Sequence, residues 1–352
     1  MTVASRRPLK RGWTTGACAT AATKAALQVL WGDATPTTVG ITLPKGEQPV
    51  FALEMTRSGA GWAEAAIEKD AGDDPDVTHG AVIVARVEAS AGGVVFAAGE
   101  GVGHVTKPGL PIGVGEPAIN PVPRAMMRGV VEEQAIVFDR AQDVKITISV
   151  RDGAALALKT WNPRLGIEGG LSILGTTGVV RPFSCAAWIA SIHRGIDVAT
   201  ATGTAHVAGC TGATSEAVVQ KLYDLPDHAM LDMGDFAGGL LKYLKAHPVA
   251  RITIGGGIGK MTKLAQGARD LHSKRSQVDF EILEAWAIAA DLPSVKDANT
   301  ALEAVTRAGK PLAQIVADHA LDHVQEMLKG SDVIADTVVI DRAGMILARS
   351  GV

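Results

Sequence analysis

The chain has 352 residues, 47% of them hydrophobic, and its formal net charge at pH 7 is −3. A chain of this length buries a sizeable core and is expected to form about two domains. The near-neutral charge balance excludes the globally basic surface that is typical of proteins that bind nucleic acid or anionic membranes, and no stretch approaches the roughly 20 apolar residues of a membrane span.

The first predicted element is an amphipathic helix over residues 16–31. Lys24 interrupts its apolar run, so the segment lacks the continuous hydrophobic stretch of a secretion signal. A hairpin is predicted over residues 37–55, with Lys45 and Gly46 at its turn. The absence of a secretion signal, and three cysteines without a CxxC pair, favour a reducing cytoplasm over a secreted, disulfide-bonded fold.

The rest of the first 161 residues alternates strand-like and helical patterns around one long loop. Residues 99–124 are rich in glycine and proline, and an ordered loop of that length in a compact domain is usually functional. A helix is predicted over residues 124–135, and strands are predicted over residues 63–70, 80–90, 144–150 and 154–161. Residues 1–161 are therefore expected to form an N-terminal mixed α/β domain.

From residue 162 onward, an apolar strand, a glycine turn and a helix follow one another four times. The predicted strands lie within residues 171–178, 204–212, 228–235 and 250–260, and a hairpin is predicted at residues 336–351. Strands that alternate with helices of this kind are typical of βαβ units in a parallel sheet. Residues 162–352 are therefore expected to form a doubly wound α/β domain whose ligand lies at the carboxyl ends of the strands.

One glycine turn, between a strand and a helix, is a strong candidate for contact with a cofactor. Its candidate residues are Gly255, Gly256, Gly257 and Gly259. Close backbone approach and unpaired helix N–H groups there suit a carboxylate, a phosphate or a ribose. Met261 follows Lys260, so the turn lacks the Lys-Ser/Thr ending of a P-loop, and its glycine spacing is not that of a dinucleotide motif. A tight turn without a ligand is the alternative.

A second glycine turn and an acidic residue are further candidates for cofactor binding. The turn consists of Gly175, Thr176, Thr177 and Gly178, which follow a predicted strand. Asp235 follows another strand, where an acidic side chain commonly accepts hydrogen bonds from ribose hydroxyls in doubly wound folds. Asp235 is equally placed to cap the helix that follows it.

Several polar residues in the loops are candidates for binding a ligand that carries several carboxylates. They are Thr14, Thr15, Lys107, Arg124 and Arg164. Either threonine also suits the N-cap of the first helix, and ordinary solvation is the alternative for the basic residues.

Residues 69–80, KDAGDDPDVTHG, contain four aspartates and one histidine. Their spacing matches neither the alternating acids and terminal glutamate of an EF-hand loop nor the several His or Cys residues of a zinc site. Some of the aspartates are expected to form the turn itself. Asp73, Asp74 and His79 are the candidate acid or base groups, and a purely structural histidine is the alternative.

Five strings occur in an order that points to one family. They are LKRGWTTGACATAA, KDAGDDPDVTHGA, GEGVGHVTKPGLPIGVGEPAINPVPR, NPRLGIEGGLSILGTTGVVRPFS and GGGIGKMTKLAQG. Together, over residues 9–267, they closely resemble the cobalt-precorrin-5B C1-methyltransferase family of cobalamin biosynthesis.

The resemblance implies an S-adenosylmethionine-dependent C-methyltransferase that converts cobalt-precorrin-5B to cobalt-precorrin-6A by methylation at C1. It also implies an N-terminal α+β domain similar to domain 2 of ribosomal protein S5, which we expect to bind the corrin substrate. The implied C-terminal domain is Rossmann-like, and we expect it to bind S-adenosylmethionine. Because the cobalt belongs to the substrate, no protein-bound metal is expected.

The expected partner is therefore a cobalt-corrinoid small molecule, with no nucleic acid and no membrane, in the cytoplasm. Transient contact with other cobalamin-pathway enzymes and a homo-oligomer stay open. A non-catalytic corrinoid-binding carrier of the same pathway is the alternative function. Titration with S-adenosylhomocysteine separates the two, because a pure carrier should not bind it. A nicotinamide-dependent dehydrogenase is disfavoured by the missing dinucleotide spacing.

Overall fold

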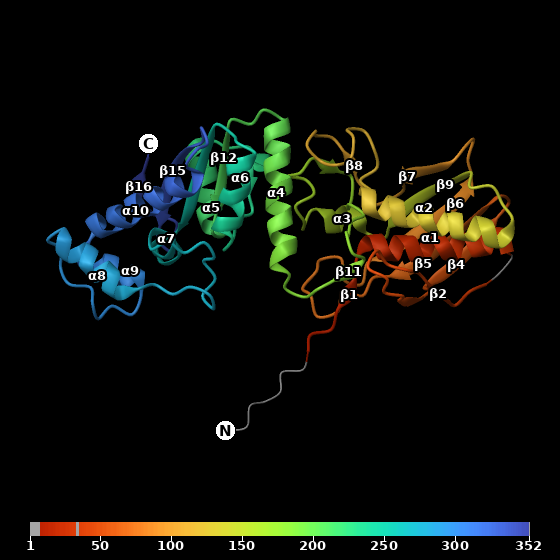
Figure 1. Cartoon of the computed structure of the whole chain (residues 1–352), viewed down its shortest axis with the longest axis horizontal. Coiled ribbons are helices and arrows are strands. Elements are labelled where there is room, and N and C mark those ends of the chain that lie inside the picture. The colour runs from red at the N-terminus through yellow and green to blue at the C-terminus, as the bar shows by residue number, and fades with distance from the viewer. Residues whose placement is uncertain (1–7, 33–34, 352) are drawn as a thin grey trace, which may run out of the picture. The chain divides into compact units, whose positions relative to one another are not determined.

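The computed structural model describes residues 8–32 and 35–351. The chain divides into two compact units, Met1–Ser184 and Cys185–Val352 (Figure 1). Each unit mixes helices with strands and has its own buried hydrophobic core, so the mixed α/β fold class is confirmed. This division places residues 162–184 in the first unit, whereas the sequence pattern assigned them to the second domain.

The first unit is built on a five-stranded sheet with the strand order β4-β5-β6-β9-β7. All neighbours pair antiparallel except β7 and β9, which are parallel. Every second residue of β9 is buried, because only one face of the sheet meets the core. The strands are β4 (Met55–Gly59), β5 (Trp62–Glu68), β6 (Val82–Ala89), β7 (Val94–Ala98) and β9 (Val144–Val150).

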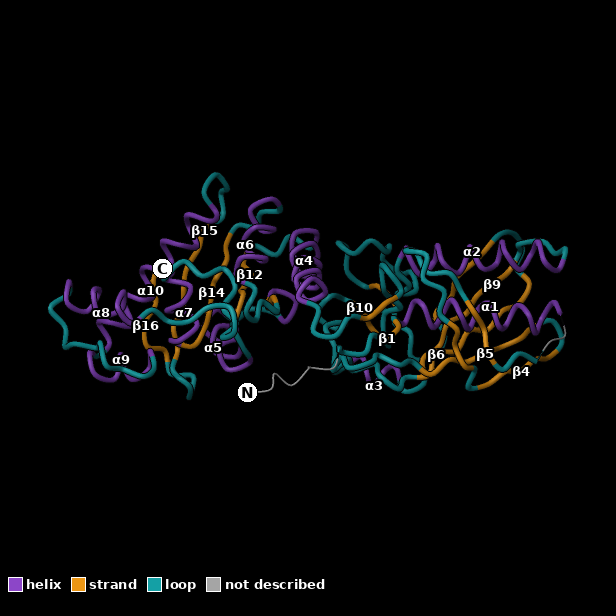
Figure 2. Tube along the Cα trace, turned by 60° about the horizontal axis from the view of Figure 1, so that its bottom comes forward, coloured by secondary structure: helices purple, strands orange, loops and turns teal. Residues whose placement is uncertain are grey.

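Two helices, α1 (Thr15–Gly32) and α2 (Pro121–Phe138), lie side by side on this sheet (Figures 1 and 2). The predicted helix at residues 16–31 is confirmed, but it is not amphipathic: 13 of its residues are buried. Its small alanine and threonine side chains allow α1 to contact β5, β6 and α2 at once. Lys24 reaches the edge of this contact and forms an ion pair with Glu133 of α2 at 2.6 Å.

The remaining strands of the first unit form short pairs. The predicted hairpin at residues 37–55 is confirmed by the antiparallel pairing of its two strands. Two other pairs join segments far apart in the sequence, and they bring residues 162–180 against the start of α1 and the long glycine-rich loop. The pairs are β2 (Thr38–Gly40) with β3 (Val50–Ala52), β1 (Gly12–Trp13) with β11 (Val179–Val180), and β8 (His104–Val105) with β10 (Ile167–Glu168).

Two predicted strands are wrong. The chain leaves the sheet after β9 because Asp152 adopts a left-handed backbone conformation with φ of 57°, and the next residues form the short helix α3 (Gly153–Ala157) instead of a strand at residues 154–161. Residues 171–178 form no named strand and contribute only isolated bridges, in which Leu171 faces Val102 and Ile173 faces Ile119.

The second unit contains a five-stranded sheet with the order β13-β12-β14-β15-β16. The first four strands are parallel, and β16 pairs antiparallel with β15, which confirms the predicted C-terminal hairpin. The strands are β12 (His206–Cys210), β13 (Met230–Leu231), β14 (Arg251–Gly257), β15 (Ile334–Ile340) and β16 (Ile346–Ser350).

The connections of this sheet leave β12 and β14 in opposite directions. The chain passes from β12 to β13 on one side, whereas it passes from β14 to β15 on the other. Right-handed crossovers therefore place α5 on one face and α6 and α10 on the opposite face, and α10 contacts α6 and α7. The helices are α4 (Cys185–Ala201), α5 (Ala213–Tyr223), α6 (Ala237–Ala246), α7 (Ile258–Ala265), α8 (Phe280–Ala289), α9 (Ala301–Ala308) and α10 (Lys310–Leu328).

Candidate functional site

The carboxyl ends of β12 and β14 form a topological switch point, where open α/β sheets commonly bind ligands. The predicted glycine segment lies there: Gly255, Gly256 and Gly257 are the last residues of β14, and Gly259 lies in the first turn of α7. Lys260 joins the loops that follow three neighbouring strands. Its Nζ donates a hydrogen bond to the carbonyl oxygen of Thr211, which follows β12, at 2.9 Å. The same atom lies 2.9 Å from Oδ1 of Asp235, in the loop after β13.

The candidate glycines at this edge fall into two classes. A Cβ atom at Gly255 would lie 2.6 Å from a valine side chain of α5, and one at Gly256 would lie 2.8 Å from the side chain of Thr211. Both glycines are therefore required by contacts within the protein. A Cβ atom at Gly257 or Gly259 would meet no heavy atom within 4 Å. These two can present their backbone to a ligand.

Two helices begin at the switch point without a capping side chain. Gly212 is the N-cap of α5 and Gly257 is the N-cap of α7, so neither can provide a side-chain hydrogen bond. The N–H groups of a helix's first turn, and its positive dipole end, favour an anionic or polar ligand group. A Cβ atom at Gly212 would also meet nothing within 4 Å. Sequence analysis missed Thr211 and Gly212, although the string GCTG between a strand and a helix is the signal that could have identified them.

Asp235 does not cap α6. The N-cap of that helix is Phe236, and no side-chain capping hydrogen bond is formed. The Asp235 side chain is 21% exposed and pairs with Lys260 through Oδ1. Its second oxygen, Oδ2, accepts no hydrogen bond from residues 8–32 or 35–351. A hydroxyl group of a ligand could donate to that oxygen.

The second candidate glycine turn lies in the first unit, at the start of α1, and not in the unit that contains β14. Gly175 has a φ of +129°, and a Cβ atom there would lie 2.3 Å from Oγ1 of Thr14. At Gly178, whose φ is +81°, a Cβ atom would lie 2.5 Å from a leucine side chain. Thr176 is exposed, and the Thr177 hydroxyl bonds within the turn, to the backbone of Val179. Contacts within the first unit therefore account for both glycines.

Thr14 and Thr15 hold the start of α1. Oγ1 of Thr14 accepts a hydrogen bond from the N–H of Ala17 at 3.2 Å, so the predicted capping role is confirmed. The Thr15 hydroxyl accepts a hydrogen bond from the N–H of Leu174 at 2.9 Å and donates to its carbonyl oxygen at 3.3 Å. Both hydroxyls already have protein partners.

The three basic candidates of the first unit differ in their surroundings. Arg124 is only 18% exposed, and it donates to two backbone carbonyls of the 99–124 loop and pairs with Glu116 at 2.8 Å. It therefore fastens that loop to α2. The guanidinium of Arg164 lies 4.5 Å from the ring centre of Trp161, and the Lys107 side chain packs on Gly166.

Residues 69–80 form a turn in which the aspartate carboxylates accept hydrogen bonds from backbone N–H groups. Oδ2 of Asp73 accepts a hydrogen bond from the backbone N–H of Lys10 at 2.6 Å. Oδ1 of Asp74 accepts one from the N–H of Phe183 at 2.8 Å. These two carboxylates therefore tie the turn to the segments before β1 and after β11. Nδ1 of His79 accepts the N–H of Ala71 at 3.0 Å, so the neutral imidazole carries its proton on Nε2.

A buried ion pair stabilises the same turn. Lys69 is 1% exposed, and its Nζ lies 2.7 Å from Oδ2 of Asp76. Burial opposes ionisation of Asp76, but the Lys69 ammonium and hydrogen bonds from Thr78 outweigh it and hold the pKa of Asp76 below its usual value. Of the three candidate acid or base residues, His79 and Asp73 are exposed, with 57% of the His79 side chain accessible, and Asp74 is half-buried.

Two features of other protein classes were also sought in the described ranges, residues 8–32 and 35–351. No three His, Cys, Asp or Glu side chains there gather as the ligands of a metal ion would. No helix formed by those residues is long and apolar enough to cross a lipid bilayer.

Comparisons with known proteins agree over nearly the whole chain. Residues 2–182 match the family described as CbiD, and residues 270–351 match the family described as CbiD, C-terminal domain. A solved structure of a cobalamin biosynthesis protein from Archaeoglobus fulgidus is 28% identical, with a TM-score of 0.42, and the match covers 76% of this chain and 83% of that one.

Curated relatives are much more similar. A protein of Brucella anthropi is 59% identical over 97% of this chain and 95% of its own length. Proteins of Paramagnetospirillum magneticum and Rhodospirillum rubrum are 56% and 54% identical to this chain. Each match covers 98% of this chain, and the matches cover 99% and 98% of the two relatives' own lengths. All three are named cobalt-precorrin-5B C(1)-methyltransferase. The chain therefore belongs to the CbiD family, as its sequence motifs indicated.

Proposed function

We propose that this chain transfers a methyl group from S-adenosylmethionine to C1 of cobalt-precorrin-5B, giving cobalt-precorrin-6A in cobalamin biosynthesis. The observation that carries this function is the 54–59% identity, over at least 97% of the chain, to proteins named for that reaction. The substrate is then a cobalt-corrinoid, whose metal ion arrives as part of the substrate and needs no site on the protein.

S-adenosylmethionine is assigned to the carboxyl ends of β12, β13 and β14. The open backbone at Gly212, Gly257 and Gly259 fits close approach of a ligand. The uncapped first turns of α5 and α7 fit a carboxylate such as that of the methionine part. Oδ2 of Asp235 fits a ribose hydroxyl. When bound, S-adenosylmethionine supplies an electrophilic methyl group on a sulfonium.

The protein's own contribution is mainly orientation. Transfer of a methyl group from a sulfonium needs no nucleophile on the protein, because the attacking atom is a carbon of the substrate. Holding two reactants in line at contact distance can supply roughly 7–11 kcal/mol of a barrier. A positioned acid or base contributes about 10²–10⁴-fold, and His79, through the proton on Nε2, is the candidate for that role.

Finer features of the fold belong to the same proposal. The strand order of the second unit, with neighbouring connections that leave in opposite directions, supports a Rossmann-like, doubly wound domain that binds the methyl donor. In the first unit, α1 and α2 cover one face of a mostly antiparallel sheet. This arrangement supports a likeness to domain 2 of ribosomal protein S5 and a role in corrin binding. We place the protein in the cytoplasm, without a metal of its own.

Anaerobic incubation with cobalt-precorrin-5B and S-adenosylmethionine labelled in its methyl group tests the reaction. Mass analysis should show one labelled methyl group in the corrinoid product. Titration with S-adenosylhomocysteine should show binding. Binding of the corrinoid without methyl transfer, and without binding of S-adenosylhomocysteine, would instead support a carrier.

Substitution of Gly257 by Val tests the assigned donor site. Because a Cβ atom there meets no heavy atom within 4 Å, the variant should keep its stability while its affinity for S-adenosylhomocysteine falls at least about tenfold. Gly129, on an exposed part of α2, also has open space around it, so Gly129→Val is the matched control. Equal affinities in calorimetry for Gly257→Val and the wild type would move the donor site elsewhere.

A further inference from the structure

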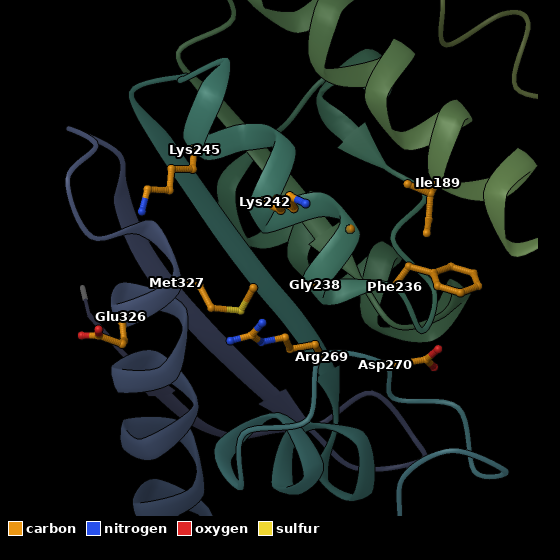
Figure 3. A pocket seen from close by; sticks show the side chains of 10 residues that line it. Ile189, Phe236, Gly238, Lys242, Lys245, Arg269, Asp270, Glu326 and Met327 are labelled. Carbon is orange, nitrogen blue, oxygen red and sulfur yellow. The ribbon is translucent and has the colours of Figure 1, made fainter.

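A groove of about 550 Å³ in the second unit lies along α6, between α4, the loop after α7 and the end of α10 (Figure 3). Its volume falls within the range of roughly 300–1,000 Å³ that is typical of small-molecule sites. The groove lies outside the set of residues assigned above to the methyl donor. Its lining combines basic side chains with an apolar surface.

Three basic side chains line the groove: Lys242 and Lys245 of α6, and Arg269 of the loop after α7. Within the part of the chain that the structure describes, none of the three has a carboxylate within ion-pair distance. Two acidic residues, Asp270 and Glu326, also line the groove. Figure 3 shows their carboxylates pointing away from the Arg269 guanidinium.

Each of the two acids has another basic residue as its partner. Asp270 forms an ion pair with Arg275, and Glu326 lies 3.5 Å from Nζ of Lys329. The groove therefore has a positive field that its own acids do not cancel. A ligand with more than one negative charge would be attracted to it.

Apolar side chains separate the charged groups. Ile189 of α4, Phe236 at the start of α6 and Met327 of α10 contribute to the lining. A free inorganic anion would gain nothing from such a surface. An apolar body that bears carboxylates on flexible arms would contact both the apolar surface and the cations.

The groove is joined to the loop that carries Asp235. The N–H of Leu271 donates to the carbonyl oxygen of Asp235 at 2.8 Å, and the N–H of Gly238 donates to that of Arg269 at 2.8 Å. The loop of Arg269 is thus fastened to the first turn of α6 and to the residue assigned to the ribose. A ligand in the groove would lie beside the segment that borders the methyl donor.

We propose that this groove binds the carboxylate-bearing edge of the corrin substrate, with Lys242, Lys245 and Arg269 each engaging acetate or propionate side chains. The inference rests on the proposed function, because it takes the substrate class from it. S-adenosylmethionine itself is a poor occupant, since its sulfonium and ammonium groups give it a net positive charge. The groove is therefore a substrate subsite separate from the donor site.

The test compares Lys242→Gln, Lys245→Gln, Arg269→Gln and the triple variant with the wild type. Lys221→Gln is the matched control, because Lys221 is exposed on α5 and does not line the groove. Equilibrium binding of cobalt-precorrin-5B is measured anaerobically without a methyl donor, at low and at high salt. KM for the corrinoid, kcat and affinity for S-adenosylhomocysteine are measured in parallel.

Each single substitution should weaken corrinoid binding about 3- to 10-fold, and the triple substitution roughly 30-fold or more, at low salt. KM for the corrinoid should rise accordingly, while kcat and affinity for S-adenosylhomocysteine change little. The salt dependence of binding should also become shallower in the triple variant, because fewer ion pairs are screened. Lys221→Gln should match the wild type.

The outcomes separate this inference from the proposed function. If the wild type binds the corrinoid but transfers no methyl group, and the groove variants lose binding, the groove stands and the methyltransferase assignment fails. The side chains of Lys242 and Lys245 are exposed, so the single-lysine variants should fold. If the wild type methylates normally and these variants bind the corrinoid with unchanged affinity, the groove inference is overturned. A wild type that does not bind cobalt-precorrin-5B at all also overturns it.

Discussion

The two glycine segments that the sequence offered as candidates for cofactor binding are chemically different in the structure. The turn at residues 175–178 is filled by contacts within the protein. Gly175 lies against Thr14, and the nearby hydroxyls and carboxylates have backbone partners. The carboxyl end of β14 has open space at Gly257, and α7 begins there without a capping side chain. Glycine content alone therefore does not distinguish a turn required by internal contacts from one that can receive a ligand.

The difference teaches which substitutions act on stability and which act on binding. Changes around the first turn should reduce the free energy of unfolding, because they break contacts already made. Changes at the open positions of the switch point, Gly257 and Gly259, should reduce ligand affinity with little effect on unfolding. Four measurements test this contrast.

The largest effect is expected at the buried ion pair of the first unit. Asp76→Asn leaves the Lys69 ammonium, 1% exposed, without its charged partner. Loss of one partner of a buried pair typically costs about 3–5 kcal/mol of unfolding free energy. Glu47→Gln removes the exposed pair with Arg11, at 3.4 Å, and should cost at most about 1 kcal/mol. Urea denaturation measures both, and equal losses would contradict the buried character of the Lys69 pair.

The next effect is expected at Gly175. Gly175→Val places a branched side chain at a φ of +129° and against Thr14, so the loss should be about 3 kcal/mol or more. Gly169 has a φ of +83° but open space, and Gly169→Val isolates the backbone strain, at about 1–2 kcal/mol. A smaller loss at Gly175 than at Gly169 in urea denaturation would show that the contact with Thr14 is readily relieved.

Neighbouring glycines at the end of β14 provide the third comparison. Gly256→Ala brings a methyl group within 2.8 Å of the Thr211 side chain and 2.9 Å of the Met261 sulfur, which should cost about 1–3 kcal/mol. Gly257→Ala meets nothing within 4 Å and should change stability by no more than about 0.5 kcal/mol. Thermal unfolding and titration with S-adenosylhomocysteine should separate them. A stability loss at Gly257 as large as that at Gly256 would contradict the open space.

The smallest effect concerns the acid sensitivity of the second unit. Burial, together with the nearby Arg251, lowers the pKa of His206, whose Nε2 lies 2.8 Å from the Thr253 hydroxyl. The unfolded chain therefore binds a proton more readily than the native state, and stability is lost as pH falls below the usual histidine pKa of about 6.5. His206→Gln should reduce the change in unfolding free energy between pH 7 and pH 5. An unchanged pH profile would exclude His206 as a contributor.

The hydrophobic patterns predicted most of the second unit correctly because its helices, and strands such as β14 and β15, are long enough to show their own period. The short helix at Gly153–Ala157 was missed because its apolar residues fit a strand equally well. Gly257 and Gly259 were candidates from the sequence, but Gly212 was not, since its importance depends on the position of β12 beside β14. Lys242, Lys245 and Arg269 come from two segments that only the tertiary structure brings to one groove.

The family, the mixed α/β class and the candidate site residues could be predicted from the sequence, because they depend on local patterns and on motif strings. The tertiary structure alone decided which of those residues still have free surface. Gly175 and Gly257 both lack a side chain, and they differ in the atoms that surround them. An added Cβ atom at Gly175 would clash with Thr14, which is distant in sequence, whereas one at Gly257 would meet no heavy atom within 4 Å. Contacts between distant segments are set by how strands pair and helices pack, and no single segment of the chain contains that information.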